Sequence, residues 1–154
     1  MKKAIFILLF VLAPFCFAQN YNLTDLKSVK LQIIDEYGAL DMQTKQHLLS
    51  EAAYKLRSAG IVINEINPVA ALQFRIDLNN TNIFVEPRVL LRLELLEKVQ
   101  TFRSSSIRTD AKTYSYASLQ SFPRNNLNNK IFVFFTDRLL IDFINKWLED
   151  NPKK

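Results

Sequence analysis

The feature that most constrains the fold is the alternation of apolar and polar residues in two neighbouring segments, which is strict in the first of them. From 72 to 78 every second residue is apolar: Leu72, Phe74, Ile76 and Leu78 alternate with Gln73, Arg75 and Asp77. A longer segment, 83–102, has apolar residues on one side and charged residues on the other: Val89, Leu91, Leu93 and Leu95 against Arg88, Arg92 and Glu94. Because successive strand side chains point to opposite faces, both segments are predicted to be half-buried strands.

The polar residues 79–82 between these segments predict a turn that joins them as a hairpin. Pro87 lacks a backbone N–H, so it requires an edge position or a bulge in the second strand. The leucine-rich part of 83–102 also has a helical alternative, but the alternating charges and the preceding turn favour the hairpin.

Two other segments have helical spacing. The first is predicted from Met42 to about Ala59, with Asp41 as its N-cap and Gly60 at its C′ position. The second is predicted over 130–148, capped by Asn129, with an apolar face of Phe132, Phe135, Leu139, Leu140, Phe143, Ile144, Trp147 and Leu148. The alternative for its first part is a strand over 131–135, followed by a shorter helix.

Shorter alternating segments predict three more strands, at 29–33, 61–66 and 108–117. A turn at 104–106 and a loop at 120–129 flank the last of them. The predicted order is therefore β-α-β-β-β-β-α. It indicates an α+β fold with a mostly antiparallel sheet of four to five strands and two helices on one face, where each helix buries its apolar stripe.

The N-terminus predicts export. Lys2 and Lys3 precede an apolar run at 4–17, and Ala18 precedes polar residues, which is the layout of a cleaved signal peptide over 1–18. The run is about 14 residues, whereas a membrane-spanning helix needs roughly 20. Bulky Phe15 before Cys16 disfavours lipidation. We expect one α+β domain over 19–154 with a loose leader at 19–25, located in the periplasm or secreted.

Residue counts limit the chemistry of the mature chain. Cys16 is the only cysteine and lies in the predicted signal, so we expect no disulfide, thiolate nucleophile or cysteine metal site. His47 is the only histidine, and no metal-binding or nucleophile motif surrounds any candidate residue. Neither a cofactor nor a metal is therefore expected. Removing Lys2 and Lys3 leaves 18 basic against 15 acidic residues, a mild excess that does not favour nucleic-acid binding.

The charge is nevertheless uneven along the chain. From 88 to 130 there are eight basic residues and three acidic ones. On a shared sheet face their potentials would add and attract an anionic partner, and neighbouring tyrosines could stack on a sugar ring or a partner. The alternative is an ordinary solvated face with tyrosines that fill a cross-strand surface. The candidate binding residues, all assigned to the exposed strands, are Arg88, Arg92, Arg108, Lys112, Tyr114 and Tyr116.

A resemblance rests on the run 56–61, the alternating strand 72–78, Lys112-Thr113-Tyr114 and the terminal helix around Phe143. Together they resemble small exported α+β proteins of Gram-negative bacteria, loosely like outer-membrane assembly lipoproteins and the N-terminal domain of TolB. The chain departs from the lipoproteins in lacking their lipidation motif. The shared features are a helix ending and strand periodicities, so the resemblance carries over no functional residue.

Two functions from different classes remain, and a secreted factor that acts outside the cell is a third possibility. The first is a non-enzymatic exported binding or adaptor protein of the cell envelope, whose partner is an envelope protein or an anionic lipid or polysaccharide. The alternative is a small secreted hydrolase whose carboxylates or tyrosines converge only in the fold. A deep polar cleft would favour the hydrolase, and an exposed basic or apolar sheet face would favour the adaptor.

Overall fold

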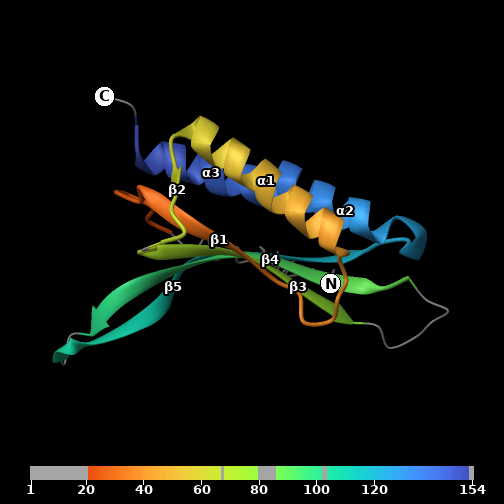
Figure 1. Cartoon of the computed structure of the whole chain (residues 1–154), viewed down its shortest axis with the longest axis horizontal. Helices are drawn as coiled ribbons and strands as arrows, with labels where there is room; N and C mark the ends of the chain where they lie inside the picture. Colours follow the sequence, from red (N-terminus) through yellow and green to blue (C-terminus); the bar gives the residue numbers. More distant parts are fainter. Residues whose placement is uncertain (1–20, 67, 80–85, 102–103, 153–154) are drawn as a thin grey trace, which may run out of the picture.

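A computed structural model describes residues 21–66, 68–79, 86–101 and 104–152. They form two layers, a sheet and a layer of helices that covers one of its faces (Figure 1). The elements are β1 (Ser28–Ile34), α1 (Met42–Ala59), β2 (Val62–Ile63), β3 (Ala70–Asn79), β4 (Arg88–Thr101), β5 (Ser104–Ser121), α2 (Leu127–Phe134) and α3 (Leu140–Asp150). The predicted α+β class and element order are confirmed. The signal segment and the turn at 80–82 lie outside the described residues.

The five strands are arranged β2-β1-β3-β4-β5. β3, β4 and β5 are antiparallel, with Phe74 opposite Leu93 and Leu93 opposite Tyr116, so the predicted hairpin is confirmed and the helical alternative is wrong. β1 pairs in parallel with both β2 and β3, which makes the sheet mixed. A parallel pair needs a crossover, and α1 provides it between β1 and β2.

Helix α1 has the predicted ends. The Asp41 carboxylate accepts a hydrogen bond from the Thr44 backbone N–H at 2.7 Å, and the pKa of Asp41 is lowered by that bond. Gly60 has a φ of 112°, and its N–H donates to the carbonyls of Leu56 and Arg57. That left-handed conformation is costly for residues with a Cβ, so Gly60 fixes the end of α1.

The terminal helix differs in detail from its prediction. It starts at Leu127 rather than Lys130, Asn129 does not cap it, and residues 131–135 are helical, so the strand alternative is wrong. Between α2 and α3 lies a π-helical segment, Phe135–Leu139, closed by a bond from the Leu140 N–H to the Phe135 carbonyl. Its wider turn shifts the inward face by one residue, so that both Leu139 and Leu140 are fully buried.

The core lies between the helices and one sheet face. It contains Leu48, Ala52 and Leu56 of α1, Leu72, Phe74 and Ile76 of β3, Val89, Leu91, Leu93 and Leu95 of β4, and Phe135, Leu139, Leu140 and Phe143 of the terminal helix. Leu148 is 38 % exposed, so it belongs to the rim rather than to the predicted apolar face.

The expected loose leader is anchored where the structure describes it. Leu23 is buried, its N–H donates to the Asp150 carboxylate at 2.8 Å, and its carbonyl accepts from the Asn151 side chain at 2.9 Å. Trp147 donates its indole N–H to the Leu26 carbonyl at 2.7 Å. Polar composition suggested a free segment, but side chains at the end of α3 satisfy its backbone groups and hold it in place.

Candidate functional site

The candidate site lies on the open face of the sheet, which we define as the face opposite the helices (Figure 1). Since Val89, Leu91, Leu93 and Leu95 face the helices, the even-numbered residues of β4 face the other way. Glu94 lies in the middle of this face and is only 3 % exposed. A buried carboxylate needs partners that compensate for the lost water.

Three cations surround Glu94. The Lys112 ammonium lies 2.6 Å from one of its carboxylate oxygens, the Arg92 guanidinium 3.6 Å from the same oxygen, and Arg75 Nε 3.7 Å from the other. Arg92 also pairs with Asp77. We call these five residues the Glu94 cluster. Three positive and two negative side chains leave the cluster with one excess positive charge.

The cluster holds more donors than its acceptors use. Two arginines and a lysine carry thirteen N–H donors. Among the described residues, the acceptors beside them are two carboxylates and the Gln73 side-chain oxygen, 3.4 Å from Arg75. The Nε atoms of Arg75 and Arg92 are buried and have no hydrogen-bond acceptor among the described residues. The side chains of Arg75, Arg92 and Lys112 remain 28 %, 27 % and 45 % exposed, so part of each side chain is open to solvent.

A glutamine pair continues the polar surface towards β1. Gln73 donates its side-chain amide to the Gln32 side-chain oxygen at 2.9 Å. Beside this pair is a hollow of about 190 Å³, whose lining includes Lys30, Lys98 and Asp110. The open face therefore has a polar hollow on the β1 side of the Glu94 cluster. On the other side, next to Asp77, it has a second hollow of about 450 Å³ whose lining includes Leu90 and Leu119.

The structure brings together only two of the four predicted cations, Arg92 and Lys112. Arg88 lies four residues earlier on β4, about 13 Å away, and Arg108 lies opposite Gln100, roughly 26 Å from Arg92 at the usual rise per residue. The hairpin arm that carries Arg108 extends beyond the helices (Figure 1). Because charges are screened over about 8 Å at physiological salt, Arg88 and Arg108 do not add to the potential of the cluster.

The two tyrosines lie on the other face. A bulge shifts the register between Leu95 and Leu96, so that Tyr114 is opposite Leu95 whereas Lys112 is opposite Leu96. The expectation that Arg108, Lys112 and both tyrosines share one face is therefore wrong. Burial raises the pKa of the Tyr114 hydroxyl, and its ring packs edge-to-face on Phe143, so it has no face free for a ligand. Tyr116 is 45 % exposed at the sheet edge.

Arg75 was absent from the predicted site. Its signal was present in the alternation of 72–78, which places Arg75 and its neighbours Gln73 and Asp77 on the polar face. The sequence does not show the register that places Arg75 opposite Arg92, and that pairing brings both cations to Glu94.

His47 and Asp35 have side chains of the types used in catalysis, but both make structural contacts. The His47 ring stacks on Phe132, with centroids 4.5 Å apart. The Asp35 carboxylate accepts the N–H groups of Ala39 and Leu40 and pairs with Lys45 at 2.8 Å, which fixes the turn before α1. No group of three or more potential metal ligands occurs among the residues that the structure describes.

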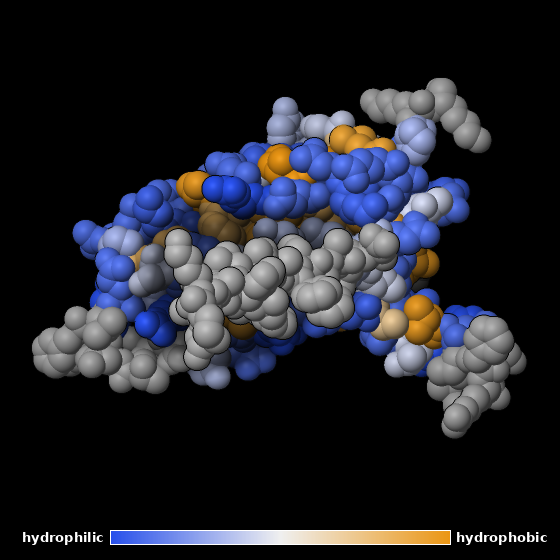
Figure 2. Space-filling view, turned by 180° about the vertical axis from the view of Figure 1, so that it is seen from behind, coloured by the Kyte–Doolittle hydropathy of each residue, from blue (hydrophilic) through white to orange (hydrophobic). Residues whose placement is uncertain are grey.

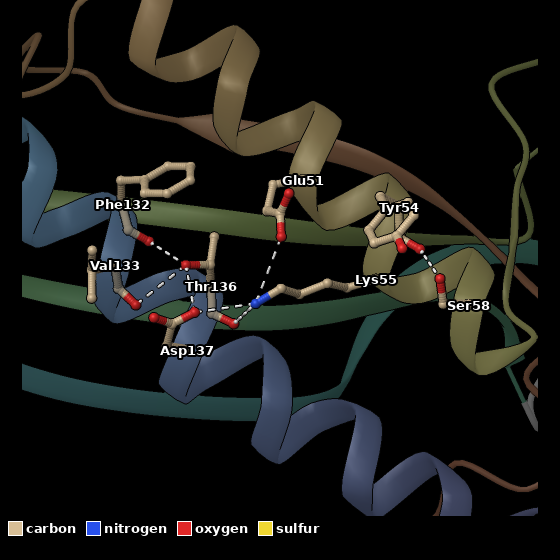
Figure 3. A network of polar contacts seen from close by, with 8 residues as sticks. All are labelled: Glu51, Tyr54, Lys55, Ser58, Phe132, Val133, Thr136 and Asp137. Atoms are coloured by element: carbon tan, nitrogen blue, oxygen red, sulfur yellow. Dashed lines mark hydrogen bonds and ion pairs between the residues drawn. The ribbon is translucent and has the colours of Figure 1, made fainter.

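A second polar network joins α1 to the π-helical segment (Figure 3). The Lys55 ammonium lies 3.1 Å from both the Thr136 carbonyl oxygen and the Asp137 carboxylate, and 3.8 Å from Glu51. The Thr136 hydroxyl donates to the Phe132 carbonyl at 3.1 Å. The network links the two helices at their irregular turn, and we assign it a structural role.

The coloured part of the surface in Figure 2 is mostly hydrophilic, with apolar residues in several separate spots. In the described part of the chain no helix is long and apolar enough to span a membrane.

No protein-family model and no curated protein matches the chain. Its structure is similar to a dodecamer of a PelC variant from Paraburkholderia phytofirmans, with 17 % identity, 78 % of this chain and 87 % of that chain covered, and a TM-score of 0.43. It is also similar to a minor lipoprotein from Acinetobacter baumannii, with 12 % identity, 79 % and 93 % covered, and a TM-score of 0.36.

A third similar structure is a putative neuraminyllactose-binding hemagglutinin homolog from Helicobacter pylori. Its identity is 9 %, the coverage is 82 % of this chain and 87 % of that chain, and the TM-score is 0.36. At such identities and TM-scores the chain is assigned to none of these families. They agree with the expected resemblance in one respect only: all three proteins are bacterial, and one of them is called a lipoprotein.

Proposed function

We propose that this chain is an exported, non-enzymatic binding protein of the cell envelope that holds an anionic group on the Glu94 cluster. The observation that carries the proposal is the surplus of donors: three cations are held around one buried carboxylate, and part of each remains open to solvent. A phosphate or carboxylate could accept the remaining outward N–H groups of Arg75, Arg92 and Lys112, and charge-assisted bonds of this kind are the stronger class.

The arrangement favours binding over hydrolysis. Glu94 is already engaged by three cations, which leaves it unsuited to act as a general base. The contacts of His47 and Asp35 are structural. No contact among the described residues specifically favours the hydrolase alternative.

Export completes the proposal. The predicted signal over 1–18 would deliver the domain 19–154 to the periplasm or beyond. Mass spectrometry of the chain recovered from the extracytoplasmic fraction is expected to give an N-terminus at or near Gln19. An intact Met1 on the major species would contradict both the localisation and the absence of cysteine in the mature chain.

Binding is tested with two anionic probes. The purified chain from Gln19 is titrated with phosphatidylglycerol vesicles and, separately, with polygalacturonate, using phosphatidylcholine vesicles and neutral dextran as controls. We expect the chain to bind one of the two anionic probes, and we expect added salt to weaken this binding. The probe that binds identifies a lipid or a polysaccharide as the source of the anion.

Variants then locate the binding surface. Arg92→Glu should weaken the anionic interaction about tenfold or more, because it replaces an attraction by a repulsion. The matched control is Arg138→Glu, an exposed reversal on the helical layer, which should leave the affinity unchanged. Equal loss in both variants would show a response to net charge alone and would contradict a site on the open face.

A further inference from the structure

A second surface lies at the edge of the sheet formed by β1 and β2, away from the β5 edge. β2 pairs with β1 at two positions only, Ser28 with Val62 and Val29 with Ile63. The last bond of this pairing runs from the Asn64 N–H to the Val29 carbonyl at 3.0 Å. β1 continues for five more residues, to Ile34, and on its other side each of these is paired with β3.

The part of β1 beyond β2 has backbone groups that face no partner strand among the described residues. Alternate residues of a strand direct their N–H and C=O groups to opposite neighbours. Because Val29 bonds to β2, Leu31 and Ile33 direct their groups to the same side, where no further strand lies among the described residues. An open strand edge of this kind is a template for another extended chain.

A groove runs along this edge. It has a volume of about 530 Å³ and lies between α1 and the strands, with apolar walls from Leu31, Leu49, Ala53 and Ile63. Figure 1 shows α1 running above β1, so the groove has a helix on one side and a strand edge on the other. Extended peptides that add a strand use this combination, in which backbone bonds give affinity and pockets select alternate side chains.

The charges at the groove indicate what suits it. Arg57 and Glu65 both line it. Glu65 lies 4.0 Å from the Lys30 ammonium, whereas Arg57 is exposed and makes no ion pair within the described ranges. An acidic group on the occupant would complement the Arg57 guanidinium.

We infer that the β1 edge binds an extended segment of a partner protein, which adds a strand beside Leu31 and Ile33. Its alternate apolar side chains enter the groove, and an acidic side chain meets Arg57. The chain would then have two binding surfaces, and this one does not depend on the proposed anion site. Such a site suits an adaptor, because the open face remains free when the edge is occupied.

Amide hydrogen exchange followed by NMR tests the edge directly. In the free chain from Gln19, the Leu31 and Ile33 amides should exchange faster than the Gln32 amide, which faces β3. The probe is a labelled peptide of alternating valine and threonine that ends in aspartate. Its binding should slow amide exchange at Leu31 and Ile33 about tenfold. This factor corresponds to the net free energy of one backbone hydrogen bond, taken near the upper end of its usual range.

A control peptide has proline at alternate positions and cannot donate the backbone bonds, so it should not bind. Slow exchange at Leu31 and Ile33 in the free chain would overturn the proposal. The same holds if the first peptide leaves these amides unchanged at its highest soluble concentration.

Two variants test the groove. Ala53→Arg fills it and should abolish peptide binding, whereas Tyr54→Arg, at the adjacent exposed position of α1, should not. Arg57→Glu should weaken binding several-fold, because it opposes the terminal aspartate. Exchange rates of the free variants confirm that each retains the fold. Unchanged affinity in both Ala53→Arg and Arg57→Glu would overturn the assignment.

Two further outcomes are distinguishable. If Leu31 and Ile33 become protected as the concentration of the chain alone rises, the occupant is a second copy and the partner proposal is wrong. The variant Arg92→Glu should bind the peptide normally, so failure of the anion proposal leaves this inference intact, and the reverse also holds.

Discussion

Glu94→Gln separates the two roles assigned to the Glu94 cluster, since it should reduce stability while it increases anion binding. Glutamine keeps the shape of the side chain and one acceptor oxygen, but it removes the negative charge that compensates three cations. The change therefore leaves Arg75, Arg92 and Lys112 with Asp77 as their one remaining carboxylate partner in the cluster.

The loss of stability can be estimated from the geometry. Breaking a fully buried ion pair costs about 3–5 kcal/mol. Glu94 is buried, but its partners are 27–45 % exposed and keep part of their hydration, and exposed pairs contribute about 0–1 kcal/mol. We therefore expect a loss of about 1–3 kcal/mol in the free energy of unfolding. For a domain of this size that lowers the melting temperature by roughly 3–10 °C.

The gain in binding follows from the same charge. Removing one negative charge about 5 Å from a bound anion is worth about 1 kcal/mol at a water-like dielectric. That corresponds to roughly fivefold tighter binding of the anionic probe. Urea denaturation and a vesicle or polysaccharide titration measure the two effects on the same preparation. Glu97→Gln is the matched control, because Glu97 is on the same strand and makes no ion pair within the described residues. Unchanged stability combined with weaker anion binding would refute the reasoning, since Glu94 would then act as a ligand-binding group.

Three further predictions concern the helical layer. Lys55→Met should lower the free energy of unfolding by about 1–2 kcal/mol, because it removes the hydrogen bonds to Thr136 and Asp137. Urea denaturation measures this loss, with Lys130→Met as the control. An unchanged denaturation midpoint would contradict the proposed link between α1 and the π-helical segment. Phe143→Ala should cost about 3–5 kcal/mol, since this ring is fully buried, and unchanged melting would place the ring outside the core. The bonds from Lys146 and Leu23 lower the pKa of Asp150. The stability that ionised Asp150 contributes to the folded chain is therefore fully present above its unfolded pKa of about 3.9. It is lost as the pH falls through the lower pKa of Asp150 in the folded state. In Asp150→Asn the melting temperature should depend less on pH below about 4, and an unchanged pH profile would argue against this bond.

The sequence predicted most of the fold because its signals were local. Asp41 and Gly60 define both ends of α1, and the alternation of 72–78 and 88–95 defines the strands that carry Glu94 and Arg75. The parallel pairing of β1 has no local signal, since it depends on how α1 packs across the sheet. The anchoring of Leu23 was missed for a similar reason, because its partner Asp150 lies at the far end of the chain.

The candidate site was predicted in part because strand alternation holds only while the register is regular. Counting from Arg108 in steps of two places Lys112, Tyr114 and Tyr116 on one face, as expected for an unbroken strand. The bulge inserts one extra residue beside Leu95 and Leu96, and every residue beyond it moves to the other face. Lys112 therefore reaches Glu94, whereas Tyr114 enters the core against Phe143. No glycine or proline marks the bulge, so its position depends on tertiary contacts. Within three residues β5 supplies a cation to the buried Glu94 and an aromatic ring to the core. A regular strand would direct both side chains to the same face.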